Sequence, residues 1–125
     1  MAAIRNKDTK PELIVRRMVH GLGYRYRLHG SGLPGKPDLI FASRRKVIFV
    51  HGCFWHRHSC SKGRSMPATR TEFWMKKLEN NKCRDENIYR KLSQLGWSYL
   101  VIWECEMKPS KINYLARRVI KFMES

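Results

Sequence analysis

Two short apolar segments, 38–42 and 46–51, constrain the fold of this chain more than any other feature. Both are rich in β-branched and aromatic residues, and only residues 43–45 separate them, which is typical of a β-hairpin. If those residues form the turn, pairing continues outward until Asp38 lies opposite Val50. The hairpin therefore places the Asp38 carboxylate beside the strand end from which the next segment begins.

That next segment, residues 51–60, has an unusual composition, with three histidines, two cysteines and a pair of adjacent aromatic residues. Imidazole and thiolate ligands together suit zinc. Cys53, His58 and Cys60 supply three such ligands, and Cys105 at the end of a later apolar segment can supply the fourth. A site closed by four protein ligands would be structural, because it leaves no position for a substrate.

The spacing leaves two assignments open. Either His58 binds zinc and His56 is the base that deprotonates an attacking water, with Asp85 or another carboxylate fixing its tautomer, or His56 is the zinc ligand and His58 is free. Cys105 has a second interpretation as a small buried residue, which is common for a lone cysteine.

Asp38 at the start of a paired strand is similar to the carboxylate of nucleases of the PD-(D/E)xK type, which hold magnesium at the end of a sheet. Magnesium prefers oxygen ligands, so one carboxylate with a backbone carbonyl and phosphate oxygens can suffice. Here Val50 and His51 stand where that pattern has an acid and a lysine. Considered alone, an aspartate before a strand is more often a turn or cap residue.

The formal charge of +16 over 125 residues favours nucleic acid as the partner, since basic residues are spread from Arg5 to Lys121. The alternative is a ribosomal or merely soluble basic protein. No apolar run approaches about 18 residues, so we expect no membrane association. A hydrophobic content of 42% indicates a folded chain, and we expect one domain over residues 1–125. Without a visible signal peptide, the cysteines are expected to be reduced in the cytoplasm.

Aromatic side chains interleaved with cations suggest stacking against nucleic-acid bases. Phe54, Trp55 and Trp74 are the candidates, although the helical spacing of Trp74 from Leu78 also fits a core position. Trp97 and Trp103 are assigned to the core.

The remaining segments predict an α/β arrangement of layers around a mixed sheet. Thr9 to Glu12 form a capping box, a sufficient structural role for Glu12 on sequence alone. The first predicted elements are a helix at 10–20 and a strand at 24–28. A helix is predicted at 71–95, either continuous or broken near 80–81. A central strand at 97–104 and a helix that is capped by Ser110 and ends near 122 follow.

Together these segments resemble the very-short-patch repair (Vsr) endonucleases. The matching motifs are Leu33-Pro34-Gly35-Lys36-Pro37-Asp38, His51-Gly52-Cys53-Phe54-Trp55-His56, Pro67-Ala68-Thr69-Arg70-Thr71-Glu72-Phe73-Trp74, Arg84-Asp85 and Ile102-Trp103-Glu104-Cys105. Residues 4–12 also match. The resemblance implies a restriction-endonuclease-like three-layer fold and an enzyme that nicks DNA 5′ of a thymine mispaired with guanine, a mismatch that arises when 5-methylcytosine deaminates.

The resemblance also implies a role for each candidate residue. Magnesium is bound by Asp38 and the Val50 carbonyl, His56 is the general base, Asp85 orients it, and Glu12 and His51 support metal-bound water or phosphate. Zinc is held by Cys53, His58, Cys60 and Cys105. The side chains that wedge into the base stack are Phe54, Trp55 and Trp74.

Several further expectations follow from the resemblance. The partner is double-stranded DNA with a T:G mismatch, the enzyme is a monomer near the nucleoid, and cooperation with mismatch-repair proteins is left open. Threonine is common in the family at Val50, a change that a backbone carbonyl ligand tolerates. Family members usually have about a dozen DNA-holding residues before the position of Met1, so a weaker grip is expected. The alternative functions are a restriction or homing nuclease for matched duplex and a non-catalytic zinc module that binds DNA.

Overall fold

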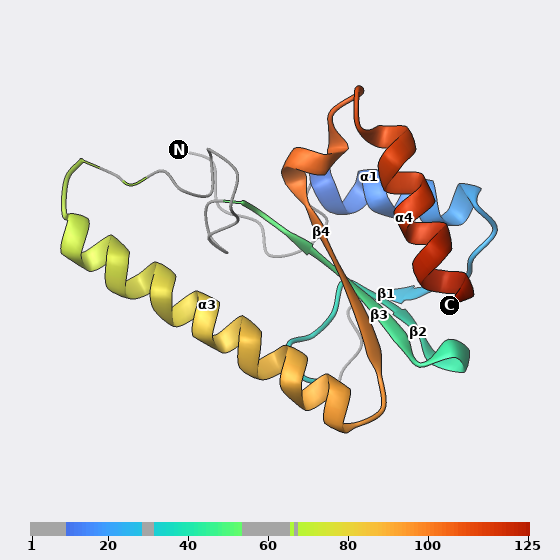
Figure 1. Ribbon diagram of the computed structural model, residues 1–125, viewed down its shortest axis with the longest axis horizontal. Coiled ribbons are helices and arrows are strands. Elements are labelled where there is room, and N and C mark those ends of the chain that lie inside the picture. The colour runs from blue at the N-terminus through green and yellow to red at the C-terminus, as the bar shows by residue number, and fades with distance from the viewer. Residues whose placement is uncertain (1–9, 29–31, 54–65, 67) are drawn as a thin grey trace.

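The computed structural model describes residues 10–28, 32–53, 66 and 68–125 (Figure 1). Its centre is a mixed sheet whose four described strands lie in chain order: β1 (Arg27–Leu28), β2 (Leu39–Phe41), β3 (Lys46–His51) and β4 (Ser98–Trp103). Neighbouring strands run antiparallel except β3 and β4, which are parallel. The predicted α/β class with a mixed sheet is confirmed.

Helices cover both faces of this sheet. The three long helices are α1 (Lys10–Gly21), α3 (Thr71–Gln94) and α4 (Ile112–Glu124). Figure 1 shows α1 and α4 together on one side of the sheet and α3 on the other, so the described chain forms three layers. None of the described helices is both long enough and apolar enough to span a membrane.

Two separate cores result because side chains alternate between the faces of a strand. On one face, Leu39 and Ile48 are fully buried against apolar residues of α1 and α4. On the other face, Val47 and Phe49 pack against Leu92 of α3. Each helix layer therefore packs against every second side chain of β3. As a result, β3 is buried along nearly its whole length.

The hairpin has a longer turn than the sequence predicted. Phe41 pairs with Lys46, and the connection is the 3₁₀ turn η1 (Ala42–Arg44) followed by Arg45 in the left-handed conformation, with φ 53°. The additional turn residue shifts the predicted register by one, so the prediction that Asp38 pairs directly with Val50 is wrong.

Other predictions also require correction. The strand predicted at 24–28 is only Arg27–Leu28, and the strand predicted to be central is β4, which lies at the edge of the described sheet. Helix α4 begins at Ile112 after Lys111 without a side-chain cap, so Ser110 is not its cap. Helix α3 continues through residues 80–81 without a break.

The buried Lys46 fastens α4 to the sheet. Its Nζ donates hydrogen bonds to the carbonyls of Phe122, Met123 and Ser125 at 2.6, 3.0 and 2.9 Å. These carbonyls carry the negative end of the helix dipole, so a buried ammonium is compensated there.

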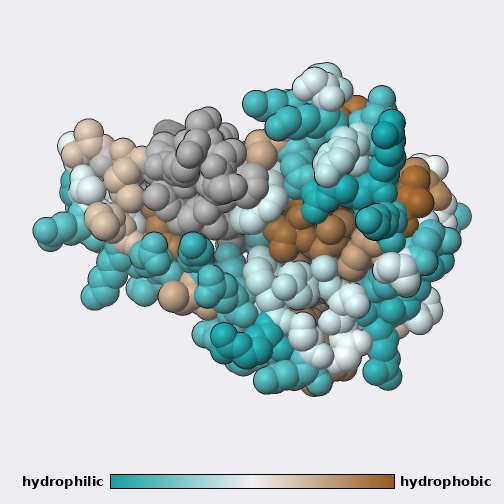
Figure 2. All heavy atoms as spheres, in the orientation of Figure 1, coloured by the Kyte–Doolittle hydropathy of each residue, from teal (hydrophilic) through white to brown (hydrophobic). Residues whose placement is uncertain are grey.

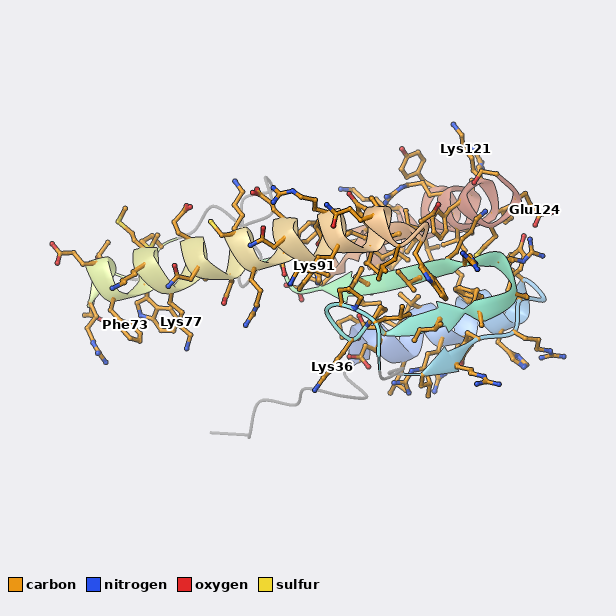
Figure 3. All side chains as sticks on the ribbon, turned by 90° about the horizontal axis from the view of Figure 1, so that it is seen from below. Lys36, Phe73, Lys77, Lys91, Lys121 and Glu124 are labelled. Atoms are coloured by element: carbon orange, nitrogen blue, oxygen red, sulfur yellow. The ribbon has the colours of Figure 1, made fainter. Side chains whose placement is uncertain are left out.

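The amino-terminal half of α3 extends well beyond the sheet (Figures 1 and 3). Side chains along this projecting part are mostly exposed. Hydrophilic side chains cover much of the face seen in Figure 2, and apolar groups show mainly beside α4. The helix therefore presents a long charged surface outside the packed body.

Candidate active site

Asp38 lies where β2 begins, and its carboxylate reaches across to β3. Oδ2 accepts a hydrogen bond of 2.6 Å from the Val50 backbone N–H, and the Asp38 N–H donates to the Ile48 carbonyl at 3.1 Å. Both backbone groups of a strand residue point to the same edge, so the Val50 carbonyl shares this edge with the carboxylate. Although the register was wrong, the predicted meeting of Asp38 with the end of β3 is confirmed.

A second carboxylate, Glu12 of α1, lies beside Asp38. Glu12 is 4% exposed and accepts a hydrogen bond of 3.0 Å from Arg16 one turn later in the helix. A helix cap does not require the contact that Glu12 makes with the Asp38 carboxyl. Thr9, the other half of the predicted capping box, lies outside the described residues. The structure thus brings Glu12 and Asp38 together from segments far apart in the sequence.

Burial raises the pKa of the Asp38 carboxyl to about 7. The Val50 N–H opposes this rise, the Glu12 carboxyl adds to it through repulsion and a hydrogen bond, and Arg16 partly offsets it. Two adjacent carboxyls and a backbone carbonyl are the hard oxygen donors that magnesium prefers. A divalent cation would also relieve the cost of ionising both acids, so these residues fit the metal that the sequence predicted.

His51 lies at the same end of β3 but faces the α3 layer. Its ring is stacked on Phe49 with centroids 5.6 Å apart, and the Trp103 ring lies 5.4 Å away. Nε2 is 2.7 Å from the hydroxyl of Tyr89 on α3. Sequence reasoning missed Tyr89, and its spacing of four residues from Asp85 was the available signal, since such residues share a helix face.

Asp85 is buried on α3, one turn before Tyr89. Burial raises the pKa of the Tyr89 phenol well above its ordinary value, and the negative charge of Asp85 adds to this rise. The phenol therefore keeps its proton. His56, which Asp85 is predicted to orient, lies outside the described residues, so that contact stays a prediction.

Two of the predicted zinc ligands are at corresponding ends of the parallel strands. His51 pairs with Trp103, and Cys53 and Cys105 each follow two residues later. Cys53 is buried, and its N–H donates a hydrogen bond of 3.1 Å to Oε1 of Glu104, in the 3₁₀ turn η2 (Glu104–Met107) that also contains Cys105.

The other two predicted ligands, His58 and Cys60, lie outside the described residues. Within the described part of the chain, no three acidic, histidine or cysteine side chains gather closely enough to hold a metal. The zinc site therefore stays a prediction, and the thiol pair is the part of the donor set that fits it.

Of the predicted wedge residues, Trp74 is described, whereas Phe54 and Trp55 are outside the described residues. Trp74 is partly exposed on the projecting part of α3, with the ammonium of Lys77, which Figure 3 labels, 5.8 Å from its ring centroid. The neighbouring Phe73 is 45% exposed and lies under the Arg70 guanidinium at 4.4 Å. Phe73 was overlooked, although it belongs to the same run of aromatics and cations.

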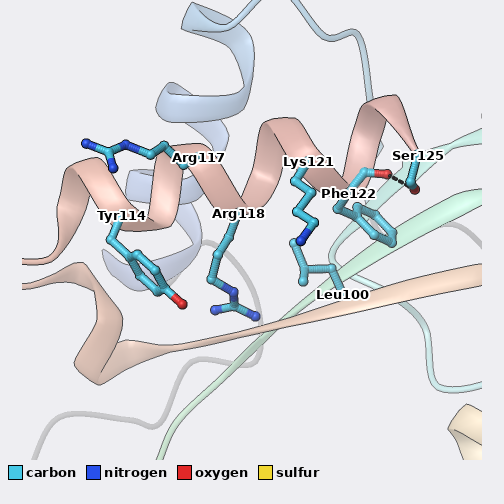
Figure 4. Close-up of a pocket in the computed structure, with 7 residues that line it drawn as sticks. All are labelled: Leu100, Tyr114, Arg117, Arg118, Lys121, Phe122 and Ser125. Atoms are coloured by element: carbon cyan, nitrogen blue, oxygen red, sulfur yellow. Dashed lines mark hydrogen bonds between the residues drawn. The ribbon is translucent and has the colours of Figure 1, made fainter.

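A groove of about 580 Å³ between α4 and β4 is lined by Leu100, Tyr114, Arg117, Arg118, Lys121, Phe122 and Ser125 (Figure 4). Arg118 is engaged there by Glu106 and by the Val101 carbonyl. The groove lining has no acid, histidine or cysteine, so it lacks the groups that hydrolyse a phosphodiester.

Comparisons with known proteins identify the family of the chain. The family model described as DNA mismatch endonuclease Vsr matches residues 1–62. A type II nicking enzyme, V.XorIIP of Xanthomonas oryzae pv. oryzae, is 48% identical over 107 residues, covering 86% of this chain and 78% of the relative. DNA mismatch endonuclease Vsr of Escherichia coli is 43% identical over 108 residues, covering 86% and 69%. Another nicking enzyme, V.NmeAIP of Neisseria meningitidis, is 39% identical over 124 residues, covering 95% and 88%.

Fold, site and relatives define the class of protein as a DNA endonuclease that nicks its substrate. The chain belongs to the Vsr family of DNA mismatch endonucleases, as the sequence motifs predicted.

Proposed function

We propose that this endonuclease uses magnesium to nick duplex DNA 5′ of the thymine in T:G mismatches, on a restriction-endonuclease-like fold stabilised by zinc. The observation that supports this most is the Asp38 carboxylate, held by the Val50 N–H beside a second buried carboxyl. The Escherichia coli relative is named a mismatch endonuclease, and two further relatives are named nicking enzymes.

Asp38 and the Val50 carbonyl are the proposed magnesium ligands. When bound, magnesium supplies Lewis-acid stabilisation of the charge that develops on the phosphate oxygens. Asp38 must be ionised for this role, and its pKa near 7 means that cation binding displaces a proton at neutral pH and below. Glu12 and His51 flank Asp38 and Val50, and they position water or phosphate oxygens there.

His56 is the proposed base, which takes the proton from the attacking water, while Asp85 orients its ring. The water oxygen forms the new bond to phosphorus, and the bond to the leaving oxygen of the scissile strand breaks. Cys53 and Cys105 with His58 and Cys60 would hold structural zinc and thereby fix the segment that carries His56.

The T:G preference is assigned to the aromatic side chains. Trp74, with Phe54 and Trp55, would insert between base pairs, a step that costs least where pairing is already imperfect. The cations around Trp74 would contact the phosphates on either side, which fits the net charge of +16 of the chain.

A strand-specific nicking assay on T:G and matched T:A duplexes, with and without magnesium, tests the proposal. We expect a single nick in the thymine strand of the T:G duplex that requires magnesium. Equal cleavage of T:A would favour a nuclease for matched duplex, and no cleavage of either would favour a non-catalytic binding module.

Asp38→Ala is expected to abolish nicking and to leave DNA affinity nearly unchanged. The matched control is Glu124→Ala, which removes an exposed carboxylate paired with Arg44 on the distant end of α4 and should retain wild-type activity. An Asp38→Ala protein that still nicks DNA would show that Asp38 is not the magnesium ligand.

A further inference from the structure

The contact between His51 and Tyr89 joins the candidate site to α3 at one defined atom. The Tyr89 hydroxyl lies 2.7 Å from His51 Nε2, and the imidazole is only 7% exposed. His51 directly follows Val50, whose backbone N–H binds the Asp38 carboxylate.

The ring contacts of His51 with Phe49 and Trp103 confine the plane of the imidazole but do not by themselves select its orientation within that plane. Stacking on Phe49 and contact with Trp103 are nearly unchanged if the ring turns by a half rotation, which exchanges its nitrogens with carbons. A hydrogen bond distinguishes the two orientations, because only nitrogen can accept or donate it. The Tyr89 hydroxyl favours the orientation in which Nε2 faces it.

The described aromatic contacts of Tyr89 involve its ring and do not involve its hydroxyl. Its ring is stacked on Tyr99, with centroids 4.5 Å apart and planes at 11°, and it contacts the Phe49 edge at 5.6 Å. A phenylalanine would make the same ring contacts. The hydroxyl adds the bond to His51 and the proximity of Asp85 one turn earlier.

We propose that Tyr89 is a positioning residue for the nicking reaction, committing His51 Nε2 to the protein so that Nδ1 is the nitrogen that contacts phosphate or water. This role rests on the proposed function of His51 at the phosphate. Tyr89 itself touches no reacting atom, and it acts through the orientation of the imidazole.

Tyr89→Phe tests the proposal, with Tyr99→Phe as the matched control. Both substitutions remove one hydroxyl and retain the stacked pair of rings, but only the first removes the bond to His51. Two measurements apply to each variant: steady-state nicking of the T:G duplex with magnesium, and nitrogen-15 NMR of the His51 ring in the metal-free protein.

For Tyr89→Phe we expect kcat to fall about tenfold while KM for the duplex stays within about twofold, because the lost neutral hydrogen bond lies within the protein and acts through the orientation of His51 in the reaction step. The His51 nitrogen signals should shift toward an average of both tautomers. Tyr99→Phe should change neither quantity. A Tyr89→Phe enzyme with wild-type kcat and unchanged His51 signals would overturn the proposal, as would an equal effect of Tyr99→Phe.

The NMR readout also separates this inference from the proposed function. If wild type fails to nick the T:G duplex, the proposed function fails, whereas the His51 signals still report whether Tyr89 fixes the ring. Unshifted signals in Tyr89→Phe overturn the positioning role even where nicking is confirmed.

Discussion

Replacing Asp38 by asparagine is predicted to inactivate the enzyme and, without metal, to make it more stable. Burial raises the Asp38 pKa from 3.8 to about 7, so the folded protein holds a proton that the unfolded chain has released over that pH range. The stabilisation from this proton is complete below pH 3.8 and is lost as the pH rises to about 7. Asparagine resembles the protonated acid and can still accept the bond from the Val50 N–H.

The size of the effect follows from the two pKa values. At about 1.36 kcal/mol per pH unit, the interval from 3.8 to about 7 corresponds to at most about 4 kcal/mol. The stability of Asp38→Asn minus that of wild type should therefore rise by up to about 4 kcal/mol between about pH 4 and about pH 8. Urea unfolding in EDTA at several pH values measures this difference.

Two further measurements sharpen this prediction. Glu12→Gln removes the neighbouring negative charge, so it should lower the Asp38 pKa and move the pH window downward. Added magnesium should stabilise wild type and leave Asp38→Asn unchanged, because only wild type has the carboxylate ligand. A stability difference between Asp38→Asn and wild type that is constant across the pH range would refute the reasoning.

Three other predictions concern zinc and DNA. Cys105→Ser should lose zinc and lower the thermal midpoint, because one missing thiolate opens a closed site; a retained metal with an unchanged midpoint would show that the ligand is misassigned. Affinity for both T:G and T:A duplexes should fall steeply with salt, since phosphate contacts release counterions, and a flat response in a binding titration would contradict the basic surface. Trp74→Ala should weaken binding to T:G by about 1–3 kcal/mol in the same titration, whereas Leu13→Ala, a substitution on α1, should not.

The sequence predicted those features that depend on local pattern. A run of β-branched and aromatic residues identified β3, the capping signals placed α1, and the run after residue 70 placed α3. The hairpin register was missed because no local signal shows that Arg45 adopts a left-handed conformation without glycine. The edge position of β4 depends on the order in which the strands pair, and the composition of a strand alone does not determine this order.

The candidate site divides in the same way. Asp38 was identifiable because a hairpin brings its two strand ends together whatever the exact register. Glu12 needed the resemblance, because the sequence alone gave its carboxylate a sufficient role as a cap. Tyr89 carried no signal beyond its spacing from Asp85, since nothing in a single helix shows which side chain on its buried face meets a histidine of the sheet.

The end of β3 explains why one strand can organise both halves of the site. Val50 turns its side chain to the α1 and α4 layer, while its backbone meets Asp38. His51, the next residue, turns to Tyr89 on α3. Because consecutive residues face opposite layers, the carboxylates and the imidazole cannot meet on either face of the sheet. A phosphate that contacts the carboxylates and the His51 imidazole must therefore lie beyond the end of β3. The segment that contains His56 follows β3 from this end.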